Sequence, residues 1–69
     1  MWIANERLKE LRKEHRETQA DLAKALNIAQ CSISKWERDV FKIPACAVVE
    51  LCRHYDVSAD WVLGLRNDR

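Results

Sequence analysis

The stretch TQADLAKALNIAQCSISKWE, residues 18–37, decides how this chain folds. Its large apolar residues recur at helical spacing on both sides of a break at residues 27–28, and they are Leu22, Leu26, Ile33 and Trp36. Spacings of three and four residues place such side chains on one face of a helix. The pattern therefore predicts two short amphipathic helices joined by a tight turn, the layout of a helix-turn-helix.

The first of these helices carries clear signals at both ends. Thr18 and Asp21 have the spacing of a capping box, with Asp in the place of the usual Glu, so the helix is predicted to begin after Thr18. It is predicted to end at Leu26, because Asn27 tolerates the left-handed conformation that a tight turn requires. The second helix, over about residues 30–38, lacks such a start.

The rest of the chain predicts three more helices around this unit. One precedes it over about residues 5–14, with Asn5 as its N-cap. Another follows a loop at residues 39–43 and has Pro44 in its first turn, where a missing N–H is harmless. Ser58 is the predicted cap of a fifth, short helix. The apolar stripes of these helices contain Leu8, Leu11, Val48, Leu51, Cys52, Tyr55 and Val62. Few breakers and almost no β-branched alternation make the fold class all-α.

Length and composition restrict the classes of function. The chain has 69 residues, of which 48% are hydrophobic and 33% charged, which is typical of one small soluble domain. We expect a domain over residues 1–65 and a polar tail over residues 66–69. The longest apolar run, residues 43–49, is far shorter than the roughly 20 residues of a membrane span. With no signal sequence, the expectation is a cytoplasmic protein without a membrane partner.

The cysteines give no sign of a metal or cofactor. Three cysteines cannot all pair within one chain, and reduced thiols in a reducing cytosol are the simplest account. Cys46 and Cys52 are expected to be small buried hydrophobes. Together with His54 they lack the C-x2-C spacing of a metal site, and residues six apart on a helix point to different faces. Cys31 lies apart from them, in the helix-turn-helix stretch.

An enzyme is not expected either. The chain has no Gly-rich phosphate loop and no nucleophile beside a base at a plausible turn. A domain of this size also has little room for a substrate pocket. No small-molecule substrate is therefore predicted, and binding is the expected kind of function.

Two further strings lie at a telling distance from the opening stretch, SISKWER at residues 32–38 and VSADWVLG at residues 57–64. With them, the chain resembles the lambdoid phage repressor and Cro family, the XRE-type helix-turn-helix regulators, over residues 3–65. The resemblance implies a five-helix repressor-like bundle with the helix-turn-helix in helices 2 and 3. It also implies a phage or prophage regulator that binds a palindromic operator as a homodimer, with helix 3 in the major groove.

The same resemblance implies which residues meet DNA. The family uses the start of helix 2 and the start of helix 3, and the matching positions are Thr18, Gln19, Gln30, Cys31, Ser32, Lys35, Arg38 and Lys42. Gln19 would bind a phosphate beside a helix N-terminus. Gln30 suits adenine, Lys35 suits guanine or a phosphate, and the thiol of Cys31 suits a thymine methyl.

Each of these assignments has a plainer alternative. Gln30 and Lys35 could be solvated residues of an exposed helix face, and Ser32 could bond its own backbone. Cys31 could be a redox sensor, because a helix N-terminus lowers the pKa of a thiol. The net charge of +1 does not by itself suggest a nucleic-acid partner, and DNA binding would then call for oligomerisation or a small local basic patch. It motivates an alternative function as a protein-interaction module, such as an antitoxin or adaptor.

Four positions depart from the family pattern, and one pair keeps it. Arg12 and Glu37 match an ion pair that bridges helices 1 and 3 in the family. Ala29 stands where a Ser or Thr usually caps helix 3. The other departures are Arg16 and Asp39, which replace common glycines, and Glu17, which replaces a common apolar residue. Arg16 and Asp39 must therefore adopt the left-handed conformation or change the turn.

Overall fold

The computed structural model describes residues 3–69, and its regular structure over that range is entirely helical. The elements in chain order are α1 (Ala4–Glu14), α2 (Gln19–Leu26), α3 (Gln30–Arg38), a 3-10 turn η1 (Val40–Lys42), α4 (Ala45–Tyr55) and α5 (Ala59–Val62). The predicted all-α fold with five helices is thus confirmed, with the helix-turn-helix formed by α2 and α3.

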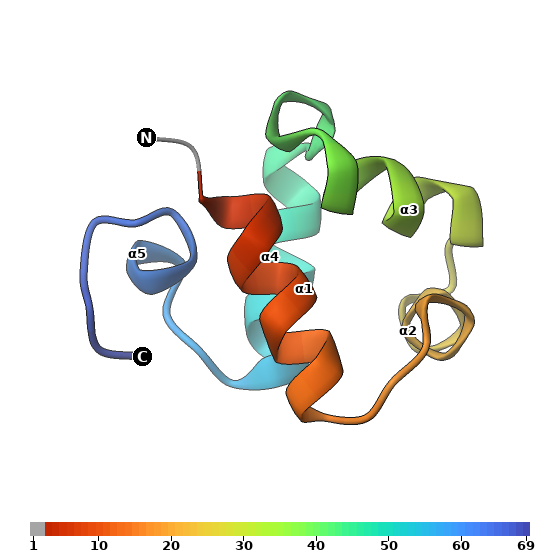
Figure 1. Ribbon diagram of the computed structural model, residues 1–69, viewed down its shortest axis with the longest axis horizontal. Helices are drawn as coiled ribbons and strands as arrows, with labels where there is room; N and C mark the ends of the chain where they lie inside the picture. Colours follow the sequence, from red (N-terminus) through yellow and green to blue (C-terminus); the bar gives the residue numbers. More distant parts are fainter. Residues whose placement is uncertain (1–2) are drawn as a thin grey trace.

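The helix α1 lies between two parts of the molecule (Figure 1). The helices α2 and α3 pack against each other on one side, and α3 also packs against α1. The short helix α5 lies on the other side and contacts both α1 and α4. One helix therefore connects the helix-turn-helix to the rest of the domain.

The core draws on every helix. Each of the five helices contributes one aliphatic side chain that is almost wholly buried, and these are Leu11, Leu22, Ile33, Leu51 and Val62. Tyr55 and Trp61 are also buried, while Trp36 is half-buried and packs against the same cluster. Burying one such side chain stabilises a fold by about 1.5–3 kcal/mol. The predicted stripes therefore hold the five helices together.

The helix ends follow the local sequence signals. The Thr18 hydroxyl accepts a hydrogen bond from the Asp21 N–H at 3.0 Å, and the Asp21 carboxylate accepts one from the Thr18 N–H at 2.9 Å. Asn27 is left-handed with a φ of 57°, and Ala29 gives α3 no side-chain cap. The Ser58 hydroxyl accepts from the Trp61 N–H at 3.1 Å, as predicted.

Three expectations were wrong. Ile3, not Asn5, precedes the first turn of α1, because Asn5 lies inside the helix and donates to the Glu37 backbone carbonyl at 3.4 Å. Pro44 is the N-cap of α4 rather than a residue of its first turn. Cys46 is exposed, because it lies in the first turn of α4 at an open groove that Leu26 and Trp36 also line, whereas Cys52 is half-buried and packs against the core.

Arg16 and Asp39, which replace common glycines, adopt different backbone conformations in their turns. Arg16 adopts the left-handed conformation with a φ of 56°. Asp39 avoids it, with a φ of −143°, and its carboxylate accepts a hydrogen bond from the Phe41 N–H at 3.0 Å. The predicted loop over residues 39–43 therefore contains the short turn η1.

Residues 66–69 fold back over α5. The guanidinium groups of Arg7 and Arg69 each lie 4.6 Å from a ring centroid of Trp61. Arg7 also donates to the backbone carbonyl of Trp61, and Arg69 forms an ion pair with Glu14.

Within the described part of the chain, no helix is long and apolar enough to cross a membrane.

Candidate nucleic-acid interface

The outward face of α3 is polar. Ile33 is buried and Trp36 half-buried on its inner face, whereas Gln30, Cys31 and Lys35 are exposed. Arg38, at the C-terminal end of α3, and Lys42, in η1, are exposed too. The structure therefore places five of the predicted contact residues where a partner can reach them.

Both serines of α3 are less exposed than Gln30, Cys31 and Lys35. Ser32, which belongs to the predicted set, is half-buried. Ser34 is also half-buried, but it lies four residues after Gln30 and four before Arg38, so it belongs to the exposed row. The sequence analysis missed Ser34, although its helical spacing from Gln30 and Arg38 was visible.

A buried carboxylate fixes α3 to the helices around it. Glu37 accepts hydrogen bonds from Arg12 Nε at 2.6 Å and from Arg12 Nη2 at 3.1 Å. The same carboxylate accepts from Gln19 Nε2 at 3.1 Å. Only 12% of the Arg12 side chain and 6% of the Glu37 side chain are exposed. We call this group of Arg12, Gln19 and Glu37 the Glu37 network; it joins α1, α2 and α3.

The electrostatics of this network favour a fixed geometry. The hydrogen bonds to Glu37 raise the pKa of Arg12 further above its already high value. The third nitrogen of that guanidinium, Nη1, donates to the Glu17 backbone carbonyl at 2.7 Å, in the turn before α2. The predicted Arg12–Glu37 pair is thus present and bridges α1 and α3. It positions α3 rather than supplying chemistry, because little of it is exposed.

At the start of α2, Thr18 caps the helix and the side chain of Gln19 already has a hydrogen-bond partner. Thr18 is exposed at the N-cap, and its hydroxyl oxygen is used by the Asp21 N–H. Gln19 is half-buried and donates to Glu37, so its amide is oriented by the Glu37 network. An amide nitrogen carries two N–H donors, and the second one is left for an external acceptor.

Glu17, in the turn before α2, is bonded to two residues of α4. Its carboxylate accepts from the Tyr55 hydroxyl at 2.7 Å and bonds the His54 Nε2 at 2.9 Å. Partial burial opposes ionisation, but the bonds from His54 and Tyr55 outweigh it and lower the pKa of Glu17. Burial and the bond to Glu17 raise the pKa of Tyr55. No signal in the sequence predicted this link from α4 to the turn, since His54 and Tyr55 are 37 and 38 residues away from Glu17.

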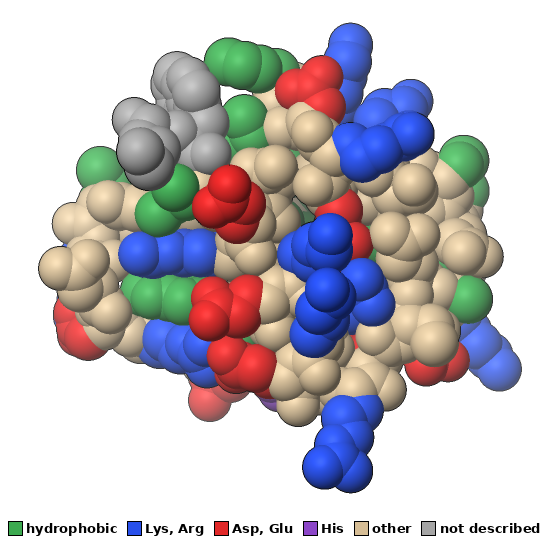
Figure 2. All heavy atoms as spheres, in the orientation of Figure 1, with side chains coloured by type: hydrophobic (Ala, Val, Ile, Leu, Met, Phe, Trp, Pro, Cys, Tyr) green, Lys and Arg blue, Asp and Glu red, His purple; other side chains and the backbone are tan. Residues whose placement is uncertain are grey.

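Acidic and basic side chains lie on different sides of α1 despite the balanced composition, although the α5 side carries basic side chains as well (Figure 2). In Figure 2, basic side chains form a column on the α3 side of α1, and acidic side chains form a column on the α5 side. More basic side chains lie above, over the end of α3 that leads into η1. A local basic patch, one of the two alternatives that the net charge of +1 calls for, is thus visible on this face. Within residues 3–69, no group of three His, Cys, Asp or Glu side chains could hold a metal ion.

The sequence is similar to those of known proteins. A family model described as a helix-turn-helix domain matches residues 5–67. The chain is 43% identical over 63 residues to the uncharacterized HTH-type transcriptional regulator YobD of Bacillus subtilis, a match that covers 91% of the chain and 56% of YobD. It is 38% identical over 58 residues to the HTH-type transcriptional regulator ImmR of the same organism, covering 84% of the chain and 46% of ImmR.

The chain thus spans about half the length of these curated relatives. No solved structure matches it significantly. The family match covers nearly the whole of the domain described above, including α2, α3 and the Glu37 network. By its sequence, this chain belongs to the XRE-type helix-turn-helix family.

Proposed function

We propose that this chain is the DNA-binding unit of a transcriptional regulator, which reads a specific operator by placing α3 in the major groove. The observation that carries the proposal is the exposed polar face of α3 on a helix that a buried ion pair holds in place. A recognition helix must be rigid, because base readout depends on hydrogen bonds of fixed geometry. The Glu37 network supplies that rigidity from two neighbouring helices.

The residue types on the face suit direct readout. Gln30 can donate to adenine N7 and accept from its N6 amino group, and Lys35 can donate to guanine or to a phosphate. Cys31 can pack against a thymine methyl. Contacts to the phosphate backbone fall to the exposed residues Thr18, Arg38 and Lys42 and to the half-buried Gln19. Ser32 and Ser34 flank the reading face.

We further propose that the regulator acts as a homodimer in the cytoplasm, by binding and not by catalysis. Val49, Leu63 and Leu65 are large apolar residues with exposed fractions of 47%, 49% and 74%. Ile43, Val49 and Leu63 line a groove between α4 and α5, away from α3. A second copy seated there would bury this surface. A dimer would bind two half-sites about 34 Å apart on one side of the duplex.

Selection of duplexes from random DNA, followed by fluorescence anisotropy, tests the proposal. The selected duplex should bind well above random DNA, and Gln30→Ala should cost about 1–3 kcal/mol and relax the preference at one base pair. Asn67→Ala removes an amide of the same kind outside α3 and should change neither. Selected duplexes that bind no better than random DNA would overturn the proposal. A stoichiometric protein partner captured without any DNA affinity would instead favour the adaptor function.

A further inference from the structure

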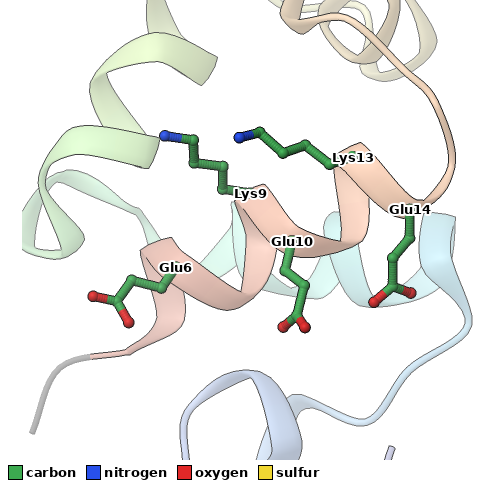
Figure 3. A pocket seen from close by; sticks show the side chains of 5 residues that line it. All are labelled: Glu6, Lys9, Glu10, Lys13 and Glu14. Carbon is green, nitrogen blue, oxygen red and sulfur yellow. The ribbon is translucent and has the colours of Figure 1, made fainter.

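The outward surface of α1 is divided lengthwise by charge. Glu6, Glu10 and Glu14 follow one another at four-residue spacing, and so do Lys9 and Lys13. The three carboxylates point to the side of the helix where α5 lies, and the two ammonium groups point to the side where α3 and α2 lie (Figure 3). We call Lys9 and Lys13 the α1 lysine row.

Each row places like charges four residues apart, although Glu6 and Lys9, and likewise Glu10 and Lys13, are opposite charges three residues apart. Opposite charges four residues apart stabilise a helix, whereas like charges at that spacing destabilise it. All neighbours at that spacing within the two rows are like-charged. Lys9 and Lys13 are exposed, and neither forms an ion pair within 4.0 Å with any residue between 3 and 69. The α1 lysine row is thus free to bind an anion from outside.

The α1 lysine row lies along the edge of α1 that adjoins the helix-turn-helix. Asn5 and Arg12, on that edge, both bond Glu37 of α3. Lys9 comes one turn after Asn5, and Lys13 directly follows Arg12. In Figure 2 the basic column on this side of α1 leads toward the basic side chains near the end of α3.

We propose that Lys9 and Lys13 bind the phosphate backbone of DNA beside the groove that α3 enters. The inference rests on the proposed function and adds α1 to the DNA-binding surface. A duplex strand is a linear polyanion, and two cations about 6 Å apart along a helix edge can follow neighbouring phosphates. Glu14 is paired with Arg69, but Glu6 and Glu10 place negative charge on the other edge of α1, which favours a duplex on the α3 side.

The salt dependence of DNA binding tests this inference. Lys9→Ala and Lys13→Ala should each reduce the slope of log K against log salt by about 0.9, and the double variant by about 1.8. The advantage of the wild type over the double variant should then shrink roughly 12-fold between 50 and 200 mM salt. The ratio between preferred and random duplexes should stay unchanged, because phosphate contacts carry no sequence information.

Arg53→Ala is the matched control. It removes one positive charge from the outward side of α4, where 77% of the Arg53 side chain is exposed, so it should leave the slope unchanged. Thermal unfolding checks that each variant is folded. Slopes equal to that of the wild type in both lysine variants would overturn the inference, as would an equal reduction by Arg53→Ala. If the wild type binds random DNA alone, the proposed function fails, but the slopes still decide on the lysine row. A wild type that binds no duplex overturns both.

Discussion

Two ion pairs join the last turn of α1 to other parts of the molecule, and they have nearly the same geometry. Arg12 and Glu37 approach to 2.6 Å, and so do Arg69 and Glu14; each pair is bidentate. Their surroundings differ. The side chains of the first pair are 12% and 6% exposed, whereas those of the second are both 41% exposed. The two pairs have the same separation between their charges but differ in burial, so comparing them isolates the effect of burial.

Burial decides what each pair does for the fold. Water and dissolved ions screen the exposed pair, so the attraction between Arg69 and Glu14 is largely offset by hydration. The buried pair has given up that hydration, and its partners satisfy each other. Only the buried pair also sets the position of a functional helix, since Glu37 belongs to α3.

The largest effect is expected from Glu37→Gln. The variant leaves the Arg12 guanidinium buried without a counter-charge, which costs about 3–5 kcal/mol of unfolding free energy. That is a large share of the roughly 5–15 kcal/mol that folds a typical domain. Urea unfolding followed by circular dichroism measures the loss. The double variant Arg12→Met/Glu37→Leu should recover much of it. A cost for Glu37→Gln below about 1 kcal/mol would mean that this pair behaves as a surface pair.

Tyr55→Phe tests a contact of intermediate burial. The variant removes the hydroxyl that donates to Glu17 and leaves the ring in the core. A hydrogen bond to a charged group contributes about 1.5–3 kcal/mol, so the loss should fall below that of Glu37→Gln. Urea unfolding of both variants under the same conditions gives the comparison. A loss as large as that of Glu37→Gln would show that burial alone does not rank these contacts.

The pH dependence of stability should test the same contact between Tyr55 and Glu17. Its pKa is lowered in the folded state, so the folded protein binds fewer protons than the unfolded chain around pH 4. The stabilisation is complete above the unfolded pKa of about 4.3 and is lost as the pH falls through the folded value. Glu17→Gln should therefore be less stable than the wild type at pH 7, and the gap should close toward pH 3.

Other carboxylates contribute to acid unfolding, so the difference between the two proteins is the observable. The bond to Arg69 lowers the pKa of Glu14, and the bonds to Thr18 lower that of Asp21. Both groups are present in wild type and variant alike. A gap that stays constant from pH 7 to pH 3 would show that Glu17 is stabilised by packing and not by charge.

A smaller effect, of opposite sign, is expected from Ala29→Ser. The α3 helix has no side-chain cap, and a serine hydroxyl there stabilises a helix start by about 1 kcal/mol. In a domain of this size that gain raises the melting temperature by roughly 4–8 °C. Thr18→Ala, which removes the existing cap of α2, should lower it by a similar amount. Residues 18 and 29 are both exposed. Equal and opposite shifts in melting temperature would therefore show that solvent weakens a hydrogen bond from a cap to the backbone less than it weakens an exposed ion pair.

Local signals in the sequence predicted most of the fold. The capping box at Thr18, the left-handed turn at Asn27 and the cap at Ser58 each depend on neighbours within a few residues. Asn5 was misplaced as a cap because its partner, the Glu37 carbonyl, is 32 residues away. The exposure of Cys46 was missed for a similar reason, since a single helical stripe does not show how far the core extends around α4.

The candidate site was less accessible from the sequence. The α3 face followed from helical spacing and from the family resemblance, and its contact with DNA stays a prediction. The link of Glu17 to Tyr55 and His54 joins α4 to the turn before α2, which periodicity cannot show. The charge rows of α1 were present in the spacing, but the edge beside α3 could be identified only once Arg12 was seen to bond Glu37.

The smallest effect is expected from Glu14→Gln. It removes the charge that faces Arg69 but keeps the shape of the side chain, and the cation–π contact of Arg69 with Trp61 remains. Because both side chains are well exposed, the melting temperature at physiological salt should not change measurably. Arg69→Ala is a poorer probe, since it removes the ring contact as well. If Glu14→Gln destabilised the protein as much as Glu37→Gln does, the 2.6 Å separation that the two pairs share, and not their burial, would determine how much each pair stabilises the fold.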